Sequence, residues 1–298
     1  MVSFSRATRS SDVARGWGRI ANQLEVLLHL IPPFVNALLA HIAPALLVIF
    51  RIGGLMIYGP VVGSSVIPGR VRVLLAFVLG AAVYPVLSAG GHVGTGLLLN
   101  LWTLAPLVAL EVLIGLLIGF LASIPLGALQ IGGVIVGQQM GLGFAQLYNP
   151  AIDDESDVVA QMLYFLALSA FIICGGLEAT VLTLLHTFDR IPVGTMAIMQ
   201  GPAMGGDIVA LITGMMISSL ELGLRVAAPL LCIVFLETVA MGFLSKTVPQ
   251  LNILSLGFPL RILVGLTILA LGAAVINDVA LEQIESGLAT VWAWVDGR

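Results

Sequence analysis

Long apolar runs separated by short polar segments make up most of the chain. A helix that crosses a membrane needs about 20 apolar residues. Pro125 divides one long run in two, and the ring of Pro229 removes a backbone hydrogen bond within another. The pattern predicts helices, several of them kinked or broken, over Phe34–Tyr58, Val71–Leu87, Leu97–Ile124, Leu126–Phe144, Val158–Ile173, Ile208–Phe243 and Leu260–Ile276. We therefore expect about six or seven helices, with about six apolar spans.

Composition supports a membrane protein. Of the 298 residues, 59% are hydrophobic and 9% are charged, whereas soluble domains carry about 25% charged residues. So few charged residues are not enough for the surface of a soluble domain. Strands of outer-membrane barrels alternate polar and apolar residues, but these runs are apolar throughout, and lipid requires each span to satisfy its own backbone. We predict an all-α polytopic helical membrane protein.

The ends of the chain differ from its apolar body. Residues 1–33 are rich in Ser and Arg, and we expect a mobile or interfacial N-terminal extension there. Pro32 and Pro33 interrupt the apolar run that a signal peptide would need. Residues 34–280 form the predicted membrane domain, and residues 281–298 form a C-terminal tail.

Several classes of function lack support. The net charge is −4, and no basic cluster indicates a nucleic-acid partner. Cys174 and Cys232 lie far apart, and the histidines have no ligand spacing. Phosphate-binding, zinc-protease and nucleophile-elbow motifs are missing from the sequence. We expect no enzyme, no catalytic residue, no cofactor and no metal site.

Seven ionisable side chains interrupt the apolar runs, where charges are costly and often functional. Glu221 and Arg225 are four residues apart and can neutralise each other on one helical face. We expect Glu111 at an interface and Glu237 as the most isolated charge, buried against another subunit or extending to an interface. The full set of intramembrane charges is Arg51, Glu111, Glu178, Glu221, Arg225, Glu237 and Arg261.

Glycine is abundant, with 34 residues. Gly115 and Gly119 make one pair of small residues, and Gly133, Gly137 and Gly141 follow one another at the same spacing. Such ladders let helix backbones approach closely in lipid. The ladders can pack helices of one chain or helices of different subunits, and the sequence favours neither.

The stretch VGQQMGLGFAQLYNP, Val136–Pro150, is half polar although its surroundings are apolar. Irregular backbone at membrane depth is tolerated only when it is buried in protein or lines an aqueous cavity. We therefore predict a movable plug or gasket at a pore or subunit interface, with an ordinary broken helix as the alternative. The plug residues are Gln138, Gln139, Met140, Gly141, Leu142, Gly143, Phe144 and Tyr148.

Three long motifs together resemble the FliR family of the flagellar type III protein export gate. They are RIGGLMIYGPVVGSSVIPGRVRVLLAF (Arg51–Phe77), GQQMGLGFAQLYNP (Gly137–Pro150) and PQLNILSLGFPLRILVGL (Pro249–Leu266). The resemblance covers roughly residues 34–280. It departs from the family in a longer N-terminal extension and in CGGLEA, Cys174–Ala179, where relatives tend to carry Asn-Gly-His.

The resemblance implies a specific role. Such a subunit joins FliP-type and FliQ-type subunits in a helical export-gate complex of the bacterial inner membrane, within the flagellar basal body. The gate associates with FlhB and FlhA, and unfolded flagellar proteins pass through it during flagellum assembly. In the family, a loop that matches Gly137–Tyr148 projects into the channel and helps to plug it.

Two alternatives remain at this point. The homologous gate of the injectisome, the virulence type III secretion system, has a related subunit. A secondary transporter would need paired broken helices in two repeated halves, whereas the sequence contains one such segment.

Overall fold

The computed structural model describes residues 33–64, 66–91, 93, 101–142, 158–194, 202–247 and 253–296. Within these residues the chain is helical, and one isolated bridge joins Val93 to Val193. The predicted all-α class is confirmed. The helices are α2 (Pro33–Tyr58), α3 (Gly69–Ala89), α4 (Leu101–Gln139), α6 (Val158–Ile173), α7 (Gly176–Arg190), α9 (Pro202–Thr247) and α10 (Ile253–Asp296).

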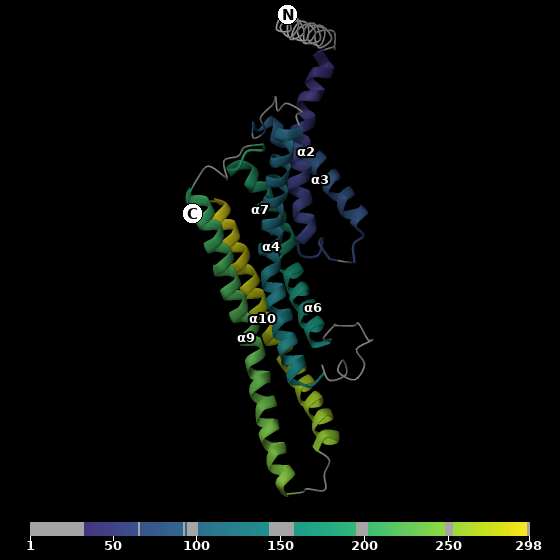
Figure 1. Cartoon of the computed structure of the whole chain (residues 1–298), viewed down its shortest axis with the longest axis vertical. Helices are drawn as coiled ribbons and strands as arrows, with labels where there is room; N and C mark the ends of the chain where they lie inside the picture. Colours follow the sequence, from purple (N-terminus) through teal and green to yellow (C-terminus); the bar gives the residue numbers. More distant parts are fainter. Residues whose placement is uncertain are drawn as a thin grey trace, which may run out of the picture.

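The helices agree with a membrane protein of about six spans. Five are long and apolar enough to cross a membrane, and α6 and α7, bent by 64° at a short break, make a sixth candidate if counted together. Helix α4 is central and packs against α2, α6, α9, α10 and α7. Figure 1 shows α9 and α10 side by side as a long hairpin that extends past the other helices at the end opposite α2 and α3.

Several helices differ from the prediction. The expected break at Pro125 is wrong, because α4 is one helix of 39 residues with Pro106 and Pro125 inside it. Pro125 is buried, and its ring lies beside Gly287 of α10. Helices in lipid tolerate proline when neighbouring elements support the freed backbone groups. Helix α9 is also continuous through Pro229.

Two further differences, in α10 and α7, concern polar helical segments. Helix α10 continues beyond Ile276 to Asp296, so residues 281–296 of the predicted tail are helical. Helix α7 was not predicted, because its hydrophobic positions alternate with threonines and charges. Its buried side includes Thr180, Thr183 and Leu184, so it packs as an amphipathic helix against α4, α6 and α10.

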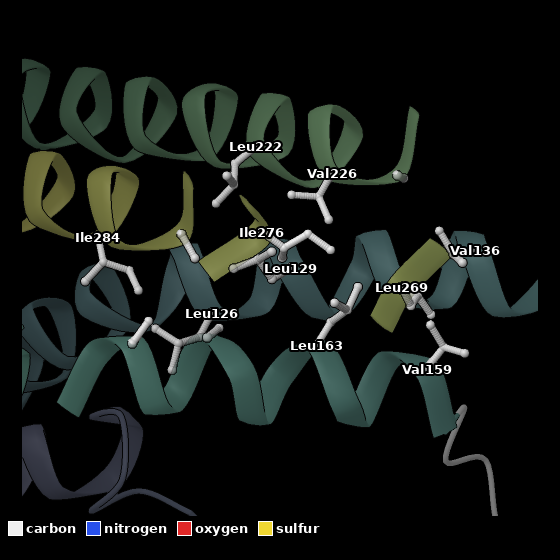
Figure 2. Packing of buried hydrophobic residues seen from close by; sticks show 14 of the residues in the cluster. Leu126, Leu129, Val136, Val159, Leu163, Leu222, Val226, Leu269, Ile276 and Ile284 are labelled. Carbon is white, nitrogen blue, oxygen red and sulfur yellow. The ribbon is translucent and has the colours of Figure 1, made fainter. Parts of the chain in front are cut away.

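The two largest clusters of buried side chains meet at α4. The smaller joins α4 to α2, α3 and α7, and includes Leu55, Ile118 and Phe188. The larger joins α4, α6, α9 and α10. In Figure 2 its side chains point inward from all four helices; the labelled residues are Leu126, Leu129, Val136, Val159, Leu163, Leu222, Val226, Leu269, Ile276 and Ile284.

The glycine ladders pack helices of this same chain. A Cβ at Gly115 would overlap the backbone oxygen of Arg51 in α2, and one at Gly119 would lie 2.8 Å from the backbone nitrogen of Gly59. A Cβ at Gly133 would lie 2.5 Å from the Cα of Ala160 in α6. For these three glycines the structure supports close approach within one chain.

Candidate functional site

The predicted plug begins at a well-formed helix end. The backbone N–H of Gly141 donates to the oxygen of Gln138 at 3.0 Å, and that of Leu142 donates to the oxygen of Gly137 at 3.1 Å. Gly141 has a φ of +83°. These bonds and a left-handed glycine form a Schellman motif, which ends a helix in a defined direction. The glycine that suggested a flexible loop therefore terminates α4.

The plug residues have different surroundings. Gln138 and Gln139 are exposed, whereas Met140 is fully buried and Leu142 packs against the larger cluster. Met140 occupies the space beside Gly265 of α10, where an added Cβ would lie 2.6 Å from its Cε. Gly143, Phe144 and Tyr148 lie outside the described residues. The described part of the predicted plug is thus packed against α10 through Met140.

Arg261 lies where α4, α9 and α10 meet. Its Nε donates to Oε2 of Glu237 at 3.0 Å, and its Nη2 donates to the hydroxyl of Thr238 at 2.8 Å. Its Nη1 donates to the backbone oxygen of Gln139 at 3.4 Å. The prediction that Glu237 is isolated is wrong, because the hairpin brings Arg261 beside it from 24 residues away. A cleft of about 300 Å³ lies next to this pair.

A second charged pair is buried between α2 and α4. Arg51 is fully buried, and its Nε donates to Oε2 of Glu111. The other oxygen of Glu111 accepts the backbone N–H of Gly194 at 3.0 Å. Only 3% of Glu111 is exposed, so its carboxylate lies inside the protein, and its expected position at an interface stays a prediction. The pair connects α2 and α4 to the segment after α7.

Arg51 makes further contacts that the sequence did not reveal. Its Nη1 donates to the hydroxyl of Thr187 at 3.2 Å, and its Nη2 donates to the oxygen of Ile191 at 3.0 Å. Its guanidinium carbon lies 4.2 Å from the centre of the Phe188 ring. These partners lie more than 130 residues further along the chain, and no local pattern predicts them.

The remaining predicted charges lie on helix surfaces. Glu221 and Arg225 form the expected pair at 3.1 Å, so that prediction is confirmed, and both side chains are about two-thirds exposed. Glu178 was predicted inside an apolar span, but it lies exposed in the first turn of α7. A carboxylate is favourable there because the N-terminus of a helix carries partial positive charge.

An open groove of about 490 Å³ was also not predicted. It lies between the turn that follows α2 and the middle of α4, with Met216 of α9 and Tyr164 of α6 at its sides. Tyr58 packs edge-on against Phe120 there, with ring centres 5.6 Å apart. The hydroxyl of Ser123 and the exposed amide of Gln130 are polar side chains of α4 that line it.

The contacts at these sites are ion pairs, hydrogen bonds and apolar packing between helices. Arg51 with Glu111 and Arg261 with Glu237 form ion pairs between helices. The described residues contain no group of three His, Cys, Asp or Glu side chains that could hold a metal ion. The strongest candidate for a functional element is the end of α4, because it leads directly into the predicted plug.

The chain is similar to known bacterial export proteins. The family model for bacterial export proteins, family 1, matches residues 42–287. The chain is 31% identical over 222 residues to the flagellar biosynthetic protein FliR of Escherichia coli (strain K12). The aligned residues make up 74% of this chain and 81% of that protein.

Two further relatives extend the comparison. The flagellar biosynthetic protein FliR of Caulobacter vibrioides is 28% identical over 260 residues, or 87% of this chain and 94% of that protein. The Yop proteins translocation protein T of Yersinia pestis is 29% identical over 183 residues, or 61% of this chain and 67% of that protein.

Proposed function

The chain belongs to the bacterial export proteins, family 1, and from this membership we propose that it is the FliR-type membrane subunit of a flagellar type III export gate. The observation that carries the proposal is similarity to flagellar FliR proteins over most of both chains. The apolar helices agree with a place in the membrane. In this role the chain is a structural part of a protein channel and performs no catalysis.

We propose FliP-type and FliQ-type subunits as its direct partners, and FlhB and FlhA as further partners of the assembled gate. The location is the inner membrane, at the flagellar basal body. The large exposed apolar surfaces support this proposal, since only 17% of the apolar windows of α3 and α10 are buried within the chain. Such surfaces need lipid or other subunits to cover them.

The segment that follows α4 is the proposed plug of the channel. The anchored end of α4 supports this role, because a plug has to be held at its base while it closes a pore. Unfolded flagellar proteins would then displace the segment during export.

Deletion of the gene tests the flagellar role. We expect loss of filaments and of swimming, with unchanged secretion by the general pathway, and restoration by a plasmid copy. Purified gate should contain the chain together with FliP-type and FliQ-type subunits, counted by native mass spectrometry. Normal filaments in a clean deletion strain would remove the flagellar proposal.

The injectisome is the second candidate, favoured by the similarity to the Yop proteins translocation protein T. In that case the same deletion would stop secretion of virulence proteins and leave filaments intact. The two candidates therefore give opposite results in one strain.

Deletion of residues 143–148 tests the plug. The anchor described above remains in this variant, so we expect the gate to assemble but to leak ions and small solutes. The measurement is membrane conductance in cells that express the gate, with assembly checked by native mass. An assembled gate that stays tight without these residues would show that the segment is ordinary packing.

A further inference from the structure

The backbone oxygen of Gln139, at the end of α4, accepts a hydrogen bond from a side chain of another helix. The Schellman motif uses the carbonyl oxygens of Gly137 and Gln138, and the N–H of Met140 bonds to Val136. The last carbonyls of a helix have no partner within it. Arg261 supplies the donor for the oxygen of Gln139, and its positive charge is favourable at the negative end of a helix.

The same guanidinium is held in place by α9. Glu237 and Thr238 accept its other N–H groups at 3.0 and 2.8 Å. The side chain of Glu237 is 8% exposed, and its Oε1 accepts no hydrogen bond from the described part of the chain. Arg261 therefore compensates the negative charge of Glu237. The two contacts with α9 also hold the guanidinium at the position from which it reaches Gln139.

A second contact lies one turn further along α10. Residues four apart lie on the same helical face, so Gly265 faces the end of α4 as Arg261 does. The Cγ, Sδ and Cε atoms of Met140 all lie within 2.9 Å of where a Cβ of Gly265 would be. One face of α10 thus provides both a hydrogen-bond donor and a notch for the last residues of α4.

We propose that Arg261 is a positioning residue of the gate: it holds the end of α4 against the α9–α10 hairpin and so sets where the plug begins. The inference rests on the proposed plug. Its consequence is that loss of the Arg261 contact lets the base of the plug move, and the closed gate then leaks although the chain remains folded and assembled.

The first test replaces the pair without leaving a stranded charge. Arg261→Met alone would leave the buried carboxylate of Glu237 unpaired, which is strongly destabilising, so the variant is Arg261→Met with Glu237→Gln. We expect a normal amount of assembled gate and a several-fold rise in conductance. The matched control is Arg225→Met with Glu221→Gln, an exposed pair within α9 alone, and the gates that assemble with this variant should have the conductance of the parent.

The second test restores the anchor by a covalent bond. Met140→Cys and Gly265→Cys are introduced into the leaky variant after Cys174 and Cys232 have been changed to Ala. The Cγ of Met140, whose place a cysteine sulfur would take, lies 2.9 Å from the ideal Cβ of Gly265. Oxidation should form the disulfide and close the leak, and reduction should reopen it. A merely structural role for the ion pair would not be reversed in this way.

These experiments separate the possible failures. An assembled Arg261→Met, Glu237→Gln gate that is as tight as the parent overturns the inference, and so does a leak that persists after the disulfide has formed. If that variant does not assemble, Arg261→Lys keeps the charge beside Glu237 but loses the fork that reaches Gln139. An assembled and tight Arg261→Lys gate also overturns the inference. A tight gate after deletion of residues 143–148 instead contradicts the plug itself.

Discussion

Arg51 shows how one residue can determine the crossing of two helices. Its backbone oxygen faces Gly115 at the closest approach of α2 and α4, and its guanidinium pairs with Glu111 one turn away. Removing two charges from water is costly, and the pair compensates only through good geometry and further hydrogen bonds. Thr187 and the oxygen of Ile191 provide those bonds.

We expect Arg51→Met to destabilise the chain by about 3–5 kcal/mol, because it leaves a buried carboxylate without its cation. Arg51→Met combined with Glu111→Leu should recover much of this loss, since no charge is then buried. The measurement is thermal unfolding of the purified gate in detergent. Equal losses in the single and the double variant would mean that the ion pair is not the source of the effect.

Gly115 and Gly127 lie on the same helix and make a matched pair. A Cβ at Gly115 would overlap the backbone of α2, whereas one at Gly127 meets nothing within 4 Å. Gly115→Ala should cost about 1–3 kcal/mol through overpacking. Gly127→Ala should be neutral or stabilising, because alanine favours a helix by about 1 kcal/mol over glycine. Unfolding in denaturant compares them, and similar losses would contradict the proposed close approach.

At the scale of elements, the break between α6 and α7 sets the direction in which α7 runs. The two helices meet at 64°, and Gly175 between them has a φ of +71°. This bend turns α7 so that Thr187 and Phe188 reach Arg51. The buried hydroxyls of Thr180 and Thr183 donate to carbonyls of α7 itself, so the amphipathic helix can be buried at little cost.

Gly175→Ala should therefore destabilise the chain by about 1 kcal/mol, because a residue with a Cβ is strained in the left-handed region. No atom lies within 4 Å of the added Cβ, so the loss comes from the backbone alone. Gly214→Ala, which also has open space but lies in α9 without a positive φ, is the control and should cost nothing. A loss of the same size at both glycines, measured by thermal unfolding, would contradict the backbone explanation.

At the scale of the whole molecule, the exposed side of α9 bears charges that lipid alone would not favour. Glu221 and Arg225 are about two-thirds exposed in the chain by itself. Charged side chains in membranes face protein or water rather than lipid tails. We therefore expect a neighbouring subunit to cover this side of the helix in the assembled gate.

Cys232 can report on that cover. It is exposed and lies seven residues after Arg225, on the same helical face. We expect a maleimide to label it rapidly in the isolated chain and much more slowly in the assembled gate, with half-buried Cys174 as the internal reference. Equal labelling of Cys232 in both states would mean that no subunit covers this side of α9.

Local sequence was sufficient for the features that depend on neighbouring residues. The apolar runs predicted α2 and α6 almost to the residue, because a span needs a continuous apolar length. The pairing of Glu221 with Arg225 followed from helical spacing. The helix end at Gly141 is also local in origin, since a left-handed position favours glycine, although the sequence suggested only flexibility there.

Tertiary structure decided the features that join distant parts of the chain. Glu111 lies 60 residues from Arg51, and Gln139 lies 122 residues from Arg261. No periodic pattern connects such positions, so the partners of buried charges became visible only when the helices were packed. The same holds for Pro125: its ring lacks the N–H that a helix needs, yet burial beside α10 keeps α4 continuous. Continuous apolar length thus determined which segments are long enough to cross a membrane, and helix packing determined which charges meet between them.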